Sequence, residues 1–427
     1  MRLLAVSHCY PRRSATGTCQ FIHRLHRELV ALGVDVHVLQ LADWAPPYPL
    51  SSILPEWRAN RANRGDLFES LDGVSIHHPA VVSPRPSRFF SSTPAERQRR
   101  ALEAYCRLHP VLAMAHGVIG HFMIPDGYHA LDLAHTLRIP ALAMAWGDDL
   151  HAWPAQREFA REQLIKVLRE VDVPIACSRR MVDDGNAWLA EPRDDWEVVY
   201  GGVDLSIFRP TMDPMPHRQR LFSELPFVND PSAMVLSVLA QAVVAKGYRE
   251  LLDSWVAVSA EAPAWRLVMA GGGWSELDMK AEIEARGLAG RAFWMGVQQG
   301  TDIPDFLRAS NAFVLPSYNE GLSLSVLEAL ATGLPTVTTD VGGHAEVIRD
   351  GVSGWLIPPR DTISLTRALR ELVSSDATRA SRGRAGRDAA ERIGSPATNA
   401  ARLAAVLERA VRRGPAAARR TPSLSAG

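Results

Sequence analysis

The chain has 427 residues, 47% of them apolar and 22% charged, and its 47 basic residues balance 47 acidic ones. This length and composition predict a globular protein of two domains and exclude a chain that is disordered throughout. The balanced charge provides no overall field to attract a polyanion, so we expect no nucleic-acid partner.

The N-terminus lacks the long apolar core of a signal peptide, and no apolar run reaches the roughly 18 residues of a membrane-spanning helix. The cysteines Cys9, Cys19, Cys106 and Cys177 are scattered without the spacing of metal ligands. We therefore expect a cytoplasmic protein in a reducing compartment, with no membrane contact beyond a peripheral one on the inner face of the membrane.

The first residues predict a strand, a helix and a second strand. Residues 2–8 and 34–41 are short apolar runs, and residues 16–33 between them have the apolar periodicity of a helix. Gly33 is a helix stop signal, because glycine adopts the left-handed conformation that closes a last turn. This order predicts a βαβ unit.

Residues 42–100 are rich in proline, serine and arginine, which predicts long loops. Regular alternation resumes at residue 110. The strand candidates that follow are 110–116, 140–146, 173–178 and 196–202, separated by helical stretches such as 159–171. Strands that alternate with helices predict a parallel sheet covered on both faces.

The proline-rich segment 208–217 is the candidate linker, and a second alternation of strands and helices follows it. Its strand candidates are 233–239, 265–271, 291–297, 311–317 and 334–339. Two such halves predict an α/β protein with two Rossmann-like, doubly wound parallel-sheet domains that face a central cleft. Ligands of such sheets bind at the carboxyl ends of the strands.

These patterns predict a first domain over residues 1–207 and a second over residues 208–392. Residues 393–413 predict a C-terminal helix that packs back toward the first domain. Residues 414–427 have the composition of a disordered tail.

Two glutamates, Glu320 and Glu328, are separated by seven residues around the predicted start of a helix. Ser323 is the candidate N-cap, and the amides of Gly321 and Leu322 are expected to point with its own amide at one spot. A helix N-terminus attracts phosphate, which nearby carboxylates would repel. The conflict is resolved if the carboxylates bind neutral hydroxyls at either end of a diphosphate. A nucleotide sugar has this arrangement, with a ribose at one end of the diphosphate and a sugar at the other.

This segment resembles the Glu-x7-Glu motif of retaining glycosyltransferases of the GT-B fold, family 4, also called glycosyl transferases group 1. Residues 198–210, 245–247 and 340–359 resemble further motifs of that family, and so do 121–127 and 139–150 in the first half. The resemblance covers roughly residues 1–412. Glutamates at this spacing are common on helices, so the motif is specific only in this context.

The resemblance implies a role for each matching residue. Glu328 would bind the donor ribose, Glu320 would hold hydroxyls of the transferred sugar near the reacting carbon, and Lys246 would contact the diphosphate. The other donor-binding positions that it implies are Gly17, Gln241, Gly271, Gly273, Gly296, Val297, Gly321, Leu322 and Ser323. The first domain would bind the acceptor and the second the nucleotide sugar, with no metal and no cofactor beyond that co-substrate.

The chain departs from the family pattern at two positions. Trp146 replaces a histidine that faces the sugar, and Gln241 replaces an arginine at the diphosphate. An indole cannot accept a proton. His121 and Asp149 are therefore the candidates for orienting the acceptor or a donor hydroxyl, although Asp149 fits a helix-capping role equally well.

The resemblance implies a transfer to a hydroxyl of a saccharide, small-molecule or lipid-linked acceptor. The alternative, which Trp146 and Gln241 raise, is a catalytically weakened homologue that binds a nucleotide sugar or partners an active transferase. A hydrolysing epimerase or a phosphorylase of the same fold is a third option. Residues 84–100 combine arginines with Phe89 and Phe90, which predicts either a solvated loop or a peripheral membrane contact.

Overall fold

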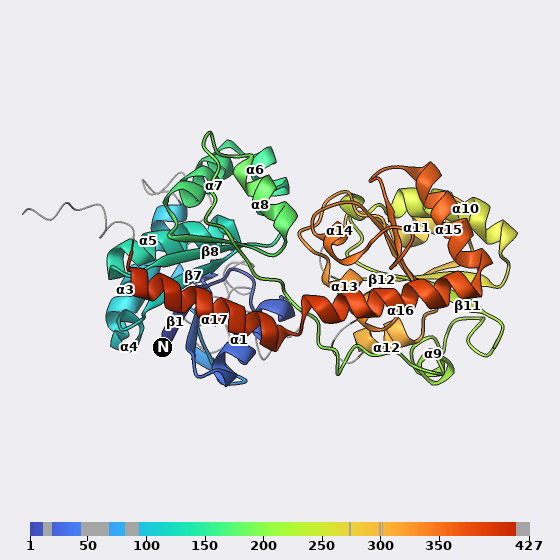
Figure 1. Ribbon diagram of the computed structural model, residues 1–427, viewed down its shortest axis with the longest axis horizontal. Coiled ribbons are helices and arrows are strands. Elements are labelled where there is room, and N and C mark those ends of the chain that lie inside the picture. The colour runs from blue at the N-terminus through green and yellow to red at the C-terminus, as the bar shows by residue number, and fades with distance from the viewer. Residues whose placement is uncertain are drawn as a thin grey trace, which may run out of the picture. The chain divides into compact units, whose positions relative to one another are not determined.

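The computed structural model describes residues 1–11, 19–43, 68–81, 94–272, 275–298, 300 and 302–415, which form two α/β units. The first unit comprises Met1–Cys177, Met181–Val199 and Ala397–Gly427, and the second comprises Ser178–Arg180 and Tyr200–Pro396. The last helix, α17 (Pro396–Arg413), therefore groups almost wholly with the first unit (Figure 1).

The first unit is built on an eight-stranded sheet with the order β10-β9-β8-β7-β1-β2-β5-β4. All neighbouring strands are parallel except β4 and β5. The strands are β1 (Arg2–Val6), β2 (Asp35–Leu39), β4 (Phe68–Leu71), β5 (Val74–His77), β7 (Gly117–His121), β8 (Ala141–Ala145), β9 (Val173–Ala176) and β10 (Glu197–Val198). A separate short pair joins β3 (Ala42–Asp43) to β6 (Ala80–Val81).

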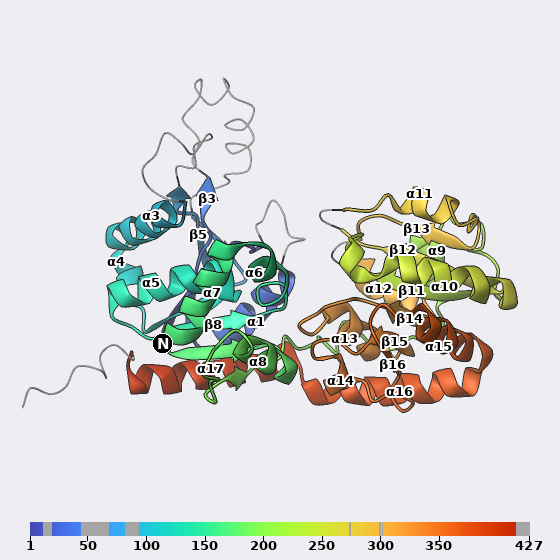
Figure 2. The ribbon, with the colours of Figure 1, turned by 90° about the horizontal axis from the view of Figure 1, so that it is seen from above.

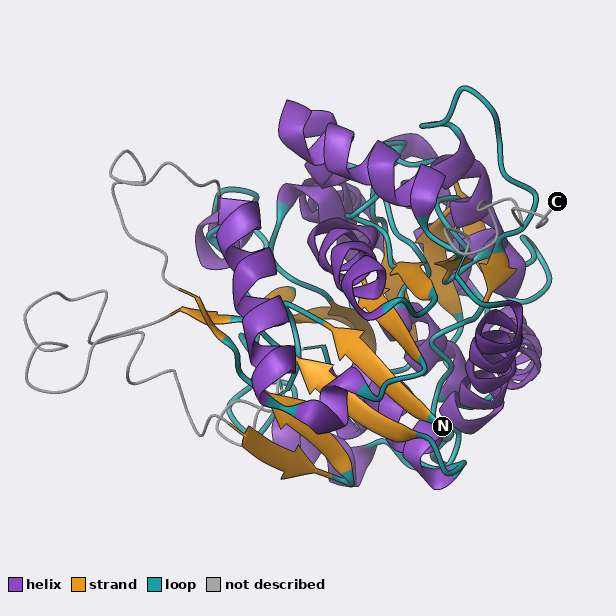
Figure 3. Ribbon diagram, turned by 90° about the vertical axis from the view of Figure 1, so that its left-hand side faces the viewer, coloured by secondary structure: helices purple, strands orange, loops and turns teal. Residues whose placement is uncertain are grey.

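Helices cover the sheet of this unit (Figures 1 and 3). They are α1 (Gln20–Ala31), α3 (Pro94–Leu108), α4 (Pro110–Ala113), the short turn η3 (Met123–Gly127), α5 (Tyr128–Leu137), α6 (Ala152–Gln156), α7 (Glu158–Glu170) and α8 (Arg179–Asn186). Because helices cover the central strands, every residue of β7 and of β8 is buried.

The second unit has a six-stranded, fully parallel sheet with the order β13-β12-β11-β14-β15-β16. Its strands are β11 (Met234–Leu239), β12 (Trp265–Ala270), β13 (Ala292–Trp294), β14 (Ala312–Leu315), β15 (Thr336–Thr339) and β16 (Trp355–Ile357). The strand order reverses between β11 and β14. Loops diverge at such a point and leave a crevice outside the carboxyl ends of the strands.

The helices of the second unit lie around this sheet (Figure 2). They are α9 (Met215–Leu221), the turn η4 (Val244–Lys246), α10 (Tyr248–Glu261), α11 (Met279–Glu284), α12 (Asp302–Arg308), α13 (Leu324–Ala331), α14 (His344–Val347), α15 (Thr362–Ser374) and α16 (Asp376–Ile393). The predicted fold class, α/β with two parallel sheets, is confirmed.

The prediction of uninterrupted loops over residues 42–100 is wrong for part of that segment. Strands β4 and β5 form a hairpin, and β5 extends the sheet beside β2. Asp72 and Gly73 make the turn with φ values of 50° and 82°. An Asp-Gly pair is favoured where both turn residues need positive φ, so the hairpin signal was present in the sequence.

Two further predictions differ from the structure. Residues 110–116 were predicted to be a strand, but Pro110 begins helix α4 and the strand β7 starts only at Gly117. Proline is favoured in the first turn of a helix because it has no N–H group to satisfy there. Strand β16 was not predicted, because its three residues are too few for a pattern.

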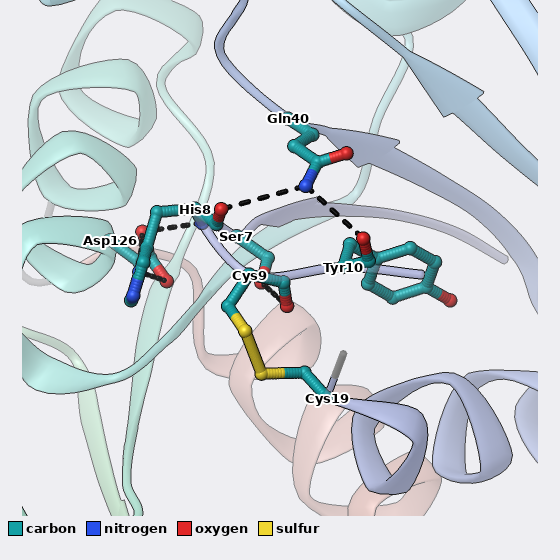
Figure 4. Close-up of a disulfide and its surroundings, with 7 residues drawn as sticks. All are labelled: Ser7, His8, Cys9, Tyr10, Cys19, Gln40 and Asp126. Carbon is teal, nitrogen blue, oxygen red and sulfur yellow. Dashed lines mark hydrogen bonds and ion pairs between the residues drawn. A yellow bond between two sulfur atoms is a disulfide. The ribbon is translucent and has the colours of Figure 1, made fainter. Parts of the chain in front are cut away.

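The structure pairs Cys9 with Cys19 in a disulfide, which the sequence analysis did not expect (Figure 4). Cys9 lies in the loop after β1 and Cys19 directly precedes α1, so the βαβ path brings their Cα atoms to 5.9 Å. That separation is within the range that a disulfide spans. Cys106 and Cys177 are buried.

Within the described ranges, no helix combines the length and the apolar character needed to cross a membrane. Residues 84–93 of the predicted membrane-contacting segment lie outside the described residues, and its remainder begins helix α3.

Buried histidines make the stability of the first unit depend on pH. His77, His121 and His129 are at most 4% exposed. Burial lowers their pKa values from 6.5 to about 4, about 3 and about 4, with neighbouring histidines adding to the effect at His77. Between pH 6.5 and about 4 the unfolded chain therefore binds protons that the folded chain does not, so stability falls as the pH falls.

We expect the free energy of unfolding to decrease by about 2 kcal/mol for each such histidine between pH 7.5 and pH 5. The substitution His77→Gln should make the fall of the melting temperature over this range shallower. Thermal unfolding at constant ionic strength measures this. His135→Gln, at an exposed position of α5, is the control, and equal slopes for the two variants would contradict the prediction.

Candidate functional site

The residues predicted to bind a donor lie at the carboxyl ends of the strands in the second unit. Lys246 ends the turn η4 after β11, and Glu320 lies in the loop between β14 and α13. The Tyr318 amide donates to Ala245 O at 2.8 Å and joins the two loops. Gly247 has a φ of 69°, and a Cβ there would lie 2.1 Å from Pro316 O, so the close approach needs glycine.

Glu320 and Lys246 form an ion pair. The Lys246 Nζ atom lies 2.8 Å from Glu320 Oε1, to which the Ser317 hydroxyl also donates at 2.7 Å. Burial alone would raise the pKa of Glu320, but the charge of Lys246 and these hydrogen bonds lower it. Glu320 is therefore an ionised hydrogen-bond acceptor, which suits the binding of sugar hydroxyls.

His344 is a residue of this site that the sequence analysis did not name. It is fully buried at the start of α14, with Nδ1 2.9 Å from Thr339 O and 3.1 Å from Thr338 Oγ1. Its Nε2 atom has no hydrogen-bond partner among the described residues. Because Nδ1 donates to the carbonyl, Nε2 is the acceptor nitrogen of a ring whose pKa burial lowers.

The loop before His344 packs on the loop of Glu320. Gly342 has a φ of 51°, and a Cβ there would lie 2.1 Å from Glu320 O. The Gly343 amide donates to Gly321 O at 2.6 Å. Two consecutive glycines precede His344 within the recognised segment 340–359. This pattern, which permits a close approach of the backbone, was the sequence signal that could have pointed to His344.

The three predicted residues that precede α13, Gly321, Leu322 and Ser323, are buried, whereas Leu324 and Ser325 in its first turn are partly exposed. Leu322 is 9% exposed and Ser323 8%. Ser323 is the N-cap residue, but its side chain makes no capping bond and its Oγ lies 3.1 Å from Ser325 Oγ instead. Glu328 lies in the second turn of α13 and is 8% exposed.

The ends of β11, β12 and β13 meet at Gly271. Its amide donates to Gly296 O at 2.9 Å, and a Cβ there would lie 1.7 Å from Ala240 O. Gln241 and Val297 are exposed beside this point. Gly17 and Gly273, which were also predicted to bind the donor, lie outside the described residues.

In the first unit, Asp149 is fully buried and bonded to the backbone. Its carboxylate accepts from the amides of Met123 at 2.7 Å, Gly147 at 2.8 Å and Trp146 at 3.1 Å. Burial raises its pKa, whereas these backbone bonds lower it. The N-cap of α6 is His151, so Asp149 does not cap that helix. Its carboxylate instead ties the loop after β8 to the turn after β7.

His121, a candidate for orienting the acceptor, ends strand β7 and is fully buried. Its Nε2 atom lies 2.8 Å from His26 Nε2, and its Nδ1 has no partner among the described residues. The ring of Trp146 lies 6.2 Å from that of His121 and 4.6 Å from that of Phe21. The His121 ring is therefore buried next to the rings of His26 and Trp146.

No group of three or more histidine, cysteine or carboxylate side chains in the described part of the chain is placed to hold a metal ion.

Two family models match the chain. The model described as "Glycosyltransferase Family 4" matches residues 15–207, and the model described as "Glycosyl transferases group 1" matches residues 226–389. The first match includes His121 and Asp149, and the second includes Lys246, Glu320, Glu328 and His344.

Two of its relatives share about a quarter to a third of their aligned residues with this chain. The lipopolysaccharide core biosynthesis mannosyltransferase LpsB of Rhizobium meliloti (strain 1021) is 32% identical over 190 residues, which are 43% of this chain and only 50% of LpsB. The D-inositol 3-phosphate glycosyltransferase of Corynebacterium kroppenstedtii is 26% identical over 411 residues, 94% of this chain and 87% of the relative.

Among solved structures, that of Anabaena HepE in complex with UDP-glucose is similar, with a TM-score of 0.69 and 15% identity. The alignment covers 96% of this chain and 100% of HepE. At this identity the likeness shows the fold alone.

The stability of the second unit should depend on the absence of a side chain at Gly271, next to the Ala240 carbonyl. The substitution Gly271→Ala should lower stability by about 1–3 kcal/mol, because its Cβ would collide with a backbone carbonyl that cannot rotate away. Its melting temperature should fall by roughly 2–4 °C per kcal/mol. Gly272→Ala is the matched control, since its Cβ meets only the side chain of Val297 at 3.0 Å. A Gly271→Ala protein as stable as this control would contradict the packing described.

Proposed function

Because the chain belongs to glycosyltransferase family 4, whose members are nucleotide-sugar-dependent enzymes of the GT-B fold, we propose that it is a retaining, metal-independent hexosyltransferase. The acceptor is a hydroxyl of a saccharide, a small molecule or a lipid-linked compound. The family predicted from the segment around Glu320 and Glu328 is confirmed by both family models. The observation that carries the proposal is the ion pair of Glu320 and Lys246 at the reversal of strand order.

The chemistry of this pair supports each part of the proposed role. Glu320 stays ionised although only 12% of its side chain is exposed, so it can accept hydrogen bonds from hydroxyls of the transferred sugar. Lys246, on the neighbouring loop, supplies a positive charge for the leaving diphosphate. His344 offers Nε2 as a further acceptor from the same side of the sheet.

We propose a UDP-sugar as the donor, because the structurally similar HepE is described in complex with UDP-glucose. LpsB, described as a mannosyltransferase, and the D-inositol 3-phosphate glycosyltransferase support a hexose and a saccharide or cyclitol acceptor.

The transfer needs no histidine base. The bond from the acceptor oxygen to the anomeric carbon forms as the bond from that carbon to the phosphate oxygen breaks. The acceptor proton passes to that leaving phosphate oxygen on the same face of the sugar. Trp146 in place of a histidine is therefore compatible with this route, because no proton is transferred to the indole.

Two residues favour a second candidate function, a weakened homologue that binds a nucleotide sugar without efficient turnover. Trp146 removes a proton-accepting side chain, and Gln241 is an uncharged residue on the loop after β11. Nucleotide binding without turnover, with activity gained by Trp146→His, would favour this candidate over the first.

We expect Glu320→Gln to lower kcat/KM for the donor by about 100-fold or more, because the amide loses the charge that binds hydroxyls and pairs with Lys246. Release of the nucleotide from a panel of UDP-, GDP- and ADP-sugars measures this. Glu284→Gln, at an exposed position of α11, is the control and should behave as the wild type. A wild-type protein that neither binds nor turns over any donor would overturn both candidate functions.

A further inference from the structure

The first unit contains a cavity of about 220 Å³ at the carboxyl ends of β1 and β2 and beside the turn that follows β7. The polar side chains that line it are those of Ser7, His8, Asp43, Gln98, Asp126 and His129, and aliphatic residues and a proline form the rest of its wall. Apolar walls with a few converging polar groups are typical of ligand sites. Pro125 and Asp126 lie in the recognised segment 121–127, whereas the other polar residues of the lining belong to no motif recognised in the sequence.

His8 and Asp126 form a bonded pair in this cavity (Figure 4). The His8 Nδ1 atom lies 3.0 Å from Asp126 Oδ2 and 3.1 Å from Oδ1, and the His8 amide donates to Oδ1 at 3.0 Å. The carboxylate is almost fully buried, whereas 39% of the His8 side chain is exposed. Because Asp126 occupies Nδ1, the nitrogen that His8 can offer to a ligand is Nε2.

The loop that carries His8 is held from several directions (Figure 4). The Gln40 side chain after β2 donates to Tyr10 O at 3.2 Å and to His8 O at 3.5 Å. The Ser7 hydroxyl donates to Cys9 O at 2.9 Å, and the disulfide joins Cys9 to the residue before α1. The position of the imidazole is therefore set before any ligand arrives, which lowers the entropy lost on binding.

A second histidine contributes to the same cavity. His129 is 3% exposed, and its Nε2 atom lies 2.9 Å from Gln98 Oε1. Since the amide oxygen accepts that bond, Nδ1 is the acceptor nitrogen, and it has no hydrogen-bond partner among the described residues. A buried acceptor without a partner costs free energy, which a hydroxyl donor from a ligand would offset.

The charge of the cavity restricts its ligand. Asp43 and Asp126 are both acidic, and no lysine or arginine of the described residues lines it. Burial lowers the pKa of His8, but the charge and hydrogen bond of Asp126 raise it, so a positive charge on His8 is already paired with Asp126 at 3.0 Å. A phosphate placed there would compete with Asp126 for that charge and would also meet the carboxylate of Asp43. The lining instead combines donors and acceptors that suit neutral hydroxyl groups.

A wider hollow of about 670 Å³ adjoins the cavity and shares Gln98, Pro125 and His129 with it. Tyr128 and the exposed Phe159 provide aromatic walls. Ligand pockets usually span about 300–1,000 Å³. The small cavity therefore suits a single ring of a ligand, and the hollow suits a substituent attached to that ring.

We propose that this cavity binds the acceptor through an uncharged polyhydroxy ring, a sugar or cyclitol without phosphate, with His8 Nε2 bonded to one of its hydroxyls. The adjoining hollow holds the remainder of a glycoside chain. This inference rests on the proposed function, since it specifies the acceptor of that transferase. His8 acts in binding and orienting the hydroxyl.

The test measures binding of matched probes to the full chain by saturation-transfer NMR titration. The neutral probes are methyl α-D-mannoside, a mannotriose and myo-inositol, and the charged ones are mannose 6-phosphate and inositol 3-phosphate. Neutral probes should bind at least fivefold more tightly than their phosphorylated counterparts, and the trisaccharide more tightly than the monosaccharide. Tighter binding of the phosphorylated probes would overturn the proposal.

His8→Ala and Gln98→Ala should each weaken binding of the neutral probes about three- to tenfold, the usual loss for one hydrogen bond. His135→Ala, on the exposed side of α5, is the matched control and should leave it unchanged. Equal affinities for all three variants would overturn the assignment of the cavity. Both substituted residues are partly exposed, so folding is expected to survive and is checked by the melting temperature.

Donor turnover, measured separately with the wild type and Glu320→Gln, distinguishes a failure of the acceptor cavity from a failure of the proposed transferase activity. If the donor is turned over but no neutral probe binds at His8, the acceptor cavity is wrong and the proposed function stands. If neutral probes bind at His8 but no donor is bound or turned over, the proposed function fails, and the assignment of the cavity to an acceptor fails with it.

Discussion

The ion pair between Lys246 and Glu320 is the contact that sets the charge at the carboxyl ends of β11 and β14 in the second unit. A carboxylate buried without a cation would take up a proton, because burial disfavours its charged form. Lys246 keeps Glu320 ionised, and the approach of the two loops at Gly247 holds the ammonium within 2.8 Å of the carboxylate. The negative charge of Glu320 therefore depends on a backbone contact at Gly247 that a residue with a Cβ atom would not allow.

In the described part of the first unit, the buried carboxylates are bonded to backbone amides and a histidine, with no lysine as partner. The carboxylates of Asp149 and Asp126 are matched by hydrogen-bond donors, three amides and His8 respectively, while the buried His77, His121 and His129 stay neutral near pH 7. This arrangement leaves the unit with few fixed charges inside. A substrate in its cavity would meet directed hydrogen bonds more than a strong field, which is suited to recognising the positions of hydroxyl groups.

Several features followed from local patterns in the sequence. The continuous apolar runs of β8 and β14, and the mainly apolar runs of β11 and β12, predicted buried parallel strands, because strands covered on both faces need apolar residues on both. The glutamate pair around the start of α13 identified the family, because residue types and spacings within one strand, loop and helix are local properties. Strand lengths and register were less predictable, as in the β4–β5 hairpin, since short strands are decided by their partners.

The sequence by itself thus determined the two parallel sheets, the family and the positions of Glu320 and Lys246. Only the tertiary structure brought these two residues together, 74 positions apart, and placed His344 behind them. It also paired His8 with Asp126 over 118 positions and buried both oxygens of Asp149 against amides. The reason is physical: sequence patterns report periods of a few residues, whereas these contacts arise where the ends of different strands converge at one edge of a sheet.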